Sequence, residues 1–88
     1  MIKVNLVFYG FLQMIVGQMD TQLFLPEDAL LNDVWRIIRE KYPRLDKDEV
    51  FNSPRVLVNG TFVDENQWNR IIIGNGDRIE FFCMVAGG

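Results

Sequence analysis

The chain has 88 residues, of which 49% are apolar and 24% charged, a composition typical of one small globular domain and not of a disordered segment. Its formal charge is −3 and its nine Lys and Arg residues form no basic stripe, which argues against nucleic-acid binding. There is no histidine and only one cysteine, which excludes a histidine acid/base, an intrachain disulfide and a cysteine-rich zinc site.

The first half of the chain predicts a hairpin followed by the main helix. Alternation of apolar and polar side chains over residues 2–9 predicts a half-buried strand, and residues 21–25 predict its antiparallel return. Between them, residues 10–17 are bounded by glycines and predict a loop or a loose helical turn. Residues 31–42 carry apolar side chains at helical spacing on one face, and Pro43 ends this helix.

The second half predicts another hairpin and a final strand. A charged connector over residues 44–53 leads to a hairpin over residues 55–63, which turns at Asn59-Gly60 because both residues tolerate positive φ. A short helical turn carrying Trp68 comes next. Residues 78–84 then predict the last strand.

The order of these elements predicts an α+β fold of the β-grasp type. The helix has one apolar stripe and needs a sheet to cover it. The first and last strands are the most apolar, so they are placed parallel in the sheet centre, joined by a crossover through the helix. We expect a mixed four- to five-stranded sheet packed on one main helix, with residues 1–84 as the domain and residues 85–88 as a flexible Gly-Gly tail.

The N-terminal region only loosely imitates a signal peptide. Lys3 precedes an apolar stretch over residues 7–16, but Gln13 interrupts it and no cleavage pattern follows. No run is long enough to span a bilayer. We therefore expect a cytoplasmic protein with no membrane association.

The sequence offers no catalytic constellation. It has no Ser/His/Asp set, no Cys/His pair, no phosphate-binding glycine loop and no metal-ligand spacing, which predicts a protein that is not an enzyme and binds no metal or cofactor. The remaining feature is the tail, Val85-Ala86-Gly87-Gly88. Extended, it reaches about 13–14 Å, and its glycines are slim enough for a narrow channel in a partner. A frayed terminus is the alternative, and two glycines alone do not decide between the two.

Several segments resemble the MoaD/ThiS family of sulfur carriers. They are Pro26-Glu27-Asp28-Ala29, Val58-Asn59-Gly60, Gly76-Asp77-Arg78-Ile79-Glu80-Phe81-Phe82 and Val85-Ala86-Gly87-Gly88. Together with the element order they extend the resemblance over nearly the whole chain. Leu30 stands where the family usually has a capping Ser or Thr, so the helix cap is expected to shift to Asp28.

The resemblance implies a carrier whose C-terminus is modified by other enzymes. An E1-like adenylyltransferase would use ATP to adenylate Gly88, and sulfur would replace the adenylate to leave a thiocarboxylate. Val85, Ala86 and Gly87 would then thread into the acceptor enzyme. The long first hairpin and full-length helix favour the large subunit of molybdopterin synthase as that enzyme, whereas residues 65–68 and the ending Met84-Val85-Ala86-Gly87-Gly88 favour thiazole synthase of thiamine synthesis.

Two other roles remain open. The same activated carboxylate could be transferred to lysines of other proteins, as in a ubiquitin-like modifier. Alternatively, the domain could be an interaction module with an inert tail.

A docking surface is expected on the open face of the sheet. In the last strand, alternate residues starting from Ile79 should pack on the helix, which leaves Phe82 and Met84 on the other face with Val7 and Tyr9. Exposed apolar clusters of this kind usually mark docking surfaces. The alternative is that a loop or the short helix covers them.

Overall fold

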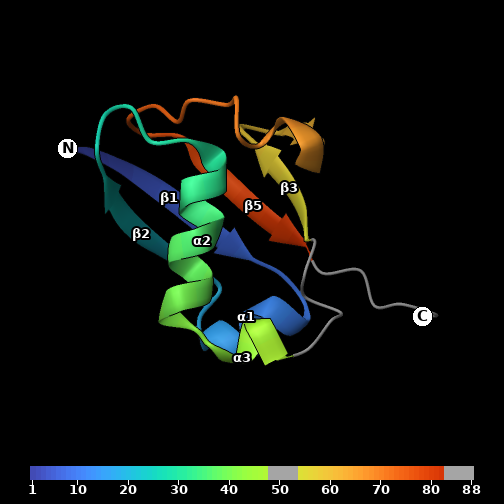
Figure 1. Cartoon of the computed structure of the whole chain (residues 1–88). Coiled ribbons are helices and arrows are strands. Elements are labelled where there is room, and N and C mark those ends of the chain that lie inside the picture. The colour runs from blue at the N-terminus through green and yellow to red at the C-terminus, as the bar shows by residue number, and fades with distance from the viewer. Residues whose placement is uncertain (48–53, 83–88) are drawn as a thin grey trace.

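The centre of the fold is a pair of parallel strands, β1 (Ile2–Phe8) and β5 (Arg78–Phe82), in a five-stranded mixed sheet (Figure 1). The structure is a computed structural model that describes residues 1–47 and 54–82. The sheet order is β2-β1-β5-β3-β4. Apart from β1 and β5, all neighbouring strands in this sheet are antiparallel. The other strands are β2 (Asp20–Leu25), β3 (Arg55–Val58) and β4 (Thr61–Val63). The predicted α+β, β-grasp class and the parallel inner strands are confirmed.

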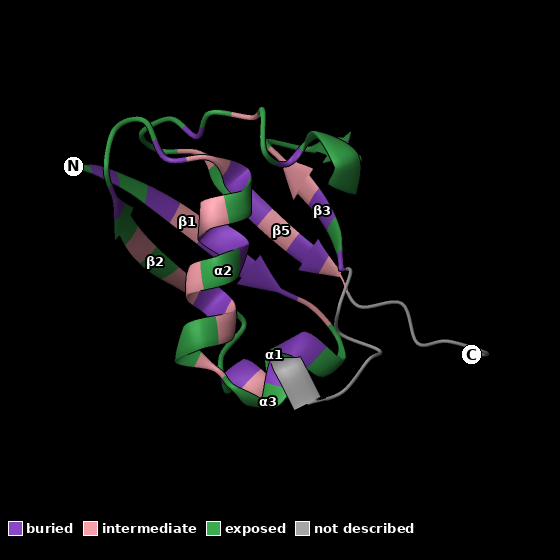
Figure 2. Cartoon of the chain, in the orientation of Figure 1, coloured by how far each residue is buried: buried purple, intermediate pink, exposed green. Residues whose placement is uncertain are grey.

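One long helix, α2 (Leu31–Lys41), packs across one face of the sheet (Figure 1). The shorter helices are α1 (Phe11–Val16), α3 (Arg44–Lys47) and the 3-10 helix η2 (Glu65–Gln67). Buried residues line the contact between α2 and the sheet, where β1 and β5 each contribute alternate side chains (Figure 2). At its middle the ring of Phe81 stacks on Phe8, with centroids 5.3 Å apart, and on Trp35, at 5.6 Å. The helical spacing in the sequence thus correctly predicted the buried face of α2.

The start of α2 differs from the prediction. Its N-cap is Leu30, which has no side-chain acceptor, and the expected cap at Asp28 is wrong. Instead Asp33, in the first turn, accepts a hydrogen bond from the Leu30 backbone N–H at 3.0 Å. That bond favours the ionised carboxylate and lowers the pKa of Asp33. A carboxylate in the first turn also suits the positive end of the helix dipole.

The connections contain more helix than the sequence indicated. Of the two possibilities left for residues 10–17, the structure has the helical one, α1, which ends at Val16 and is followed by Gly17 with a φ of 86°. The connector over residues 44–53 begins with α3. The last strand ends at Phe82 in the described region, so the predicted strand residues 83–84 and the boundary at residue 85 lie outside the described residues.

The second hairpin is confirmed and is tied to β5. Asn59 and Gly60 both have positive φ, 51° and 84°, as a tight two-residue turn between twisted strands requires. The Asn59 side chain also donates to the Asp77 carboxylate at 2.9 Å and accepts from the Arg78 backbone N–H at 2.9 Å. The turn therefore fixes the start of β5 as well as joining β3 to β4.

Replacing Phe81 by Ala should lower the free energy of unfolding by about 3–5 kcal/mol, because it leaves a cavity beneath Phe8 and Trp35. Urea denaturation of both proteins measures the difference. The matched control is Phe24→Ala on edge strand β2, where the side chain is 62% exposed and the loss should stay below about 1 kcal/mol. Equal losses at the two positions would contradict the core assignment.

Candidate functional site

The carboxyl ends of β1 and β5 meet at the same edge of the sheet, because the two strands are parallel. Phe8 pairs with Phe81, and the next residue, Tyr9, donates its backbone N–H to the Phe81 carbonyl at 3.1 Å. The chain therefore leaves β5 at Phe82 beside Tyr9. The tail residues that carry the functional prediction, Val85, Ala86, Gly87 and Gly88, lie outside the described residues.

Apolar and aromatic side chains gather on the open face of the sheet near this point. The rings of Tyr9 and Phe82 stack with centroids 4.4 Å apart and planes at 7°. Across the sheet Leu57 pairs with Phe62, which is 52% exposed. We call Tyr9, Leu57, Phe62 and Phe82 the open-face cluster. Arg55, which pairs with Phe82, places its guanidinium 5.6 Å from the Phe62 ring centroid.

Two members of the open-face cluster were missed by the sequence analysis. The signal for Leu57 and Phe62 was present, because period-two alternation across a two-residue turn places them opposite each other. Of the residues predicted for this surface, Tyr9 and Phe82 are half-buried. The expected exposure of Val7 is wrong: it is only 5% exposed and offers little contact area. Met84 lies outside the described residues.

A polar network holds the Tyr9 ring in place. Its hydroxyl donates to the Glu80 carboxylate at 2.6 Å, and Arg78 forms an ion pair with the same carboxylate at 3.6 Å. The hydrogen bond to Glu80 is the largest cause that raises the pKa of the Tyr9 phenol. The bonds to Tyr9 and Glu80 likewise raise the pKa of Arg78. Tyr9 is thus fixed by stacking on one side and by a charged acceptor on the other.

The described part of the chain contains neither a candidate metal-binding cluster nor a membrane-spanning helix. Over residues 1–47 and 54–82, no three His, Cys, Asp or Glu side chains come together to hold a metal ion. Among the same residues no helix is long and apolar enough to cross a membrane.

A family model described as the ThiS family matches residues 6–88, nearly the whole chain. The chain belongs to the ThiS family. The match confirms the resemblance noted in the sequence. No curated protein matches the sequence.

Three solved structures show the extent of the likeness in fold. A Pyrococcus furiosus protein described as molybdopterin converting factor subunit 1 aligns with a TM-score of 0.80, at 21% identity, over 97% of this chain and 100% of its own. Small archaeal modifier protein 1 of Methanosarcina acetivorans aligns at 0.76 and 23% identity, over 100% and 98%. The Helicobacter pylori complex of subunits 1 and 2 of molybdopterin-converting factor contains a chain that aligns at 0.63 and 18%, over 99% and 100%.

Replacing Glu80 by Gln should bring the pKa of Tyr9 down toward its ordinary value of about 10, because the acceptor loses its charge. A 13C NMR titration of the ring carbon bonded to the hydroxyl measures this. Because the folded-state pKa is raised, the stabilisation is present below about pH 10 and is lost as the pH rises through the folded pKa. Glu40→Gln, on α2, should leave the Tyr9 titration unchanged, and an unchanged titration in Glu80→Gln would contradict the assignment.

Proposed function

We propose that this chain is a sulfur carrier that bears a thiocarboxylate at Gly88 in molybdopterin biosynthesis. The observation that carries the proposal is the ThiS-family match, which continues through Gly88. The structure adds that the segment bearing Gly88 follows a strand in the middle of the sheet. In this role the chain is a cytoplasmic co-substrate of partner enzymes and binds no cofactor of its own.

The proposed chemistry begins with an unreactive carboxylate. The α-carboxylate has a pKa of about 3.3–3.7, so at neutral pH it is an anion and a poor electrophile. In an E1-like adenylyltransferase, one carboxylate oxygen attacks the α-phosphorus of ATP and pyrophosphate leaves. With sulfide as the donor, sulfur then attacks the carbonyl carbon of the acyl adenylate, the bond to AMP breaks, and the product is the thiocarboxylate.

The favoured acceptor is the large subunit of a molybdopterin synthase. The Pyrococcus and Helicobacter likenesses support this choice, and the Helicobacter protein was solved together with its second subunit. The long first hairpin with helix α1 supports it from the sequence side. Thiazole synthase is the alternative acceptor, in keeping with the name of the matched family.

Docking on the partner enzymes is proposed to use the open-face cluster of Tyr9, Leu57, Phe62 and Phe82. These side chains lie on the face opposite α2, and only Cys83 and Met84 separate Phe82 from the segment that would enter the partner. An apolar centre flanked by an arginine is the usual composition of a protein interface. Arg55 supplies that cation beside Phe62.

A ubiquitin-like modifier is the second candidate, supported by the likeness to the Methanosarcina modifier protein. Both roles begin with the same acyl adenylate and differ in the nucleophile, which is sulfide or persulfide for a carrier and a lysine amine for a modifier. Isopeptide-linked remnants of this chain on cellular proteins would identify the modifier role.

Incubation with the cognate activating enzyme, ATP and sulfide should raise the intact mass by one oxygen-to-sulfur exchange. A variant lacking Gly88 should show no exchange while it keeps the unfolding midpoint of the complete chain. Mass spectrometry and urea denaturation measure the two properties. An unchanged mass in the complete chain, under conditions in which the enzyme modifies its known substrate, would falsify the carrier proposal.

Replacing Phe62 by Ala should raise the KM for activation about tenfold with little change in kcat, because the ring contributes binding and not chemistry. Steady-state kinetics with the activating enzyme measure both constants. The matched control is Ile72→Ala, since Ile72 is 67% exposed but lies beside the start of α2. If both substitutions raise KM equally, docking does not use the open-face cluster.

A further inference from the structure

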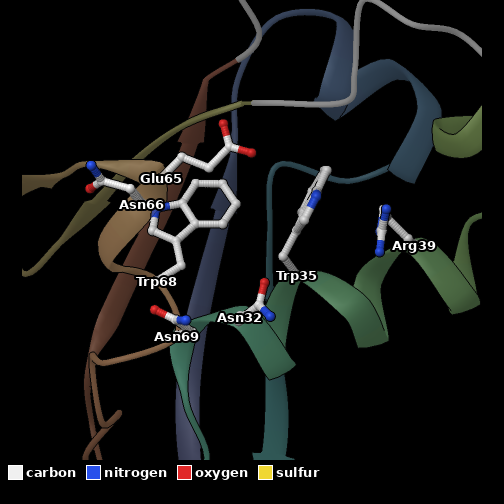
Figure 3. A pocket seen from close by; sticks show the side chains of 7 residues that line it. All are labelled: Asn32, Trp35, Arg39, Glu65, Asn66, Trp68 and Asn69. Atoms are coloured by element: carbon white, nitrogen blue, oxygen red, sulfur yellow. The ribbon is translucent and has the colours of Figure 1, made fainter.

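A hollow of about 280 Å³ lies on the helix side of the molecule, between α2 and η2 (Figure 3). The indoles of Trp35 and Trp68 form part of its wall, and these two side chains are only 4% and 3% exposed. Around them stand the carboxamides of Asn32, Asn66 and Asn69. The hollow therefore combines flat apolar rings with neutral carboxamides, and Arg39 and Glu65 add one charge of each sign to its lining.

The walls of this hollow are fixed to each other. The backbone N–H of Asn32, in the first turn of α2, donates to the Trp68 carbonyl at 3.1 Å. The Trp68 indole N–H donates to the Val63 carbonyl at 3.2 Å, and the Trp35 ring stacks on Phe81. A ligand would find the site already formed, so little ordering of the protein opposes binding.

The indole N–H of Trp35, in the wall of the hollow, has no acceptor among the described residues. The Trp35 indole nitrogen is buried and has no partner among the described residues, in contrast to that of Trp68. An indole N–H can only donate, so the group that completes it must carry an acceptor oxygen or nitrogen. Figure 3 shows the Trp35 indole standing between Trp68 and Arg39, all three of which line the hollow.

The other lining groups select among the possible acceptors. Glu65 and Arg39 place one charge of each sign at the hollow, so its lining has no net charge to attract an anion, and the whole chain carries a charge of −3. Each asparagine offers both a donor and an acceptor, which matches the N–H and C=O of a peptide group. Pockets for small molecules usually have a volume of about 300 Å³ or more. The hollow is slightly smaller than that, so its size suits a short segment of polypeptide chain.

We propose that this hollow binds an extended peptide segment of a partner protein. A main-chain carbonyl of that segment accepts the hydrogen bond from Trp35 Nε1, and the asparagine carboxamides pair with the neighbouring peptide groups. The proposal does not depend on the sulfur chemistry. Because α2 and the open-face cluster lie on opposite faces of the sheet, the chain could hold this second partner while an enzyme occupies the first face.

The test uses the two tryptophan indole N–H signals in a 15N NMR spectrum of the full chain. The probe is N-acetylglycine N-methylamide, which contains two peptide groups and no charge. It should move the Trp35 signal downfield in a saturable manner, with a Kd in the millimolar range expected for so small a ligand. The Trp68 signal should stay in place because its N–H is already bonded to Val63.

Matched variants locate the binding. The double substitution Asn66→Ala and Asn69→Ala should weaken binding at least about threefold, on the scale of one lost hydrogen bond. Gln67→Ala, in the same 3-10 helix but outside the lining, should leave the Kd unchanged. All three side chains are exposed, so the fold should be retained.

Four results would overturn the proposal. The Trp35 signal could remain unmoved up to the solubility limit of the probe, or move equally with sodium acetate, which would make the hollow an anion site. The two tryptophan signals could shift together, which would indicate a non-specific effect. A Trp35 signal already at low field without the probe would mean that the chain or a bound water completes the indole itself.

Discussion

The parallel pairing of β1 with β5 is the constraint on which the rest of this structure depends. Two neighbouring parallel strands cannot be joined by a tight turn, so the chain between them must cross over the sheet. That crossover contains α2, whose apolar face then covers β1 and β5 together. The same pairing brings the end of β5 beside Tyr9, and the segment proposed to carry the chemistry follows β5 in the sequence.

The alternating side chains of this parallel pair also give the two faces of the sheet different surroundings. On the helix side its alternate residues meet Trp35 and form the core around Phe81. On the other side the alternation places Tyr9 and Phe82 in a stack. Glu80 lies on that open face too, and because it accepts from Tyr9 and pairs with Arg78, a carboxylate is tolerated within an apolar surface.

Strong local periodicity made much of the fold predictable from the sequence. The spacing in α2 and the Asn59-Gly60 turn each specify one structure, and both are confirmed. Features set by contacts between distant residues were not predictable. The burial of Val7 is one, since alternation tells which face a residue occupies and not how closely its neighbours cover it. The capping by Asp33 is another, because Leu30 gives no local signal of a helix start.

The candidate site was predictable only in part, for a related physical reason. The Gly-Gly ending and the family motifs can be read directly, whereas the open-face cluster depends on the pairing of β3 with β4 and β5. The central position of β5 in the sheet matters for the proposed function, because the tail follows this strand. β5 is hydrogen-bonded to β1 on one side and to β3 on the other, and the buried Phe81 anchors it in the core. Pulling on the end of β5 would therefore have to break its hydrogen bonds to both strands. In the proposed carrier role the segment after β5 enters partner enzymes, and a strand hydrogen-bonded on both sides supports that segment more firmly than an edge strand bonded on one side.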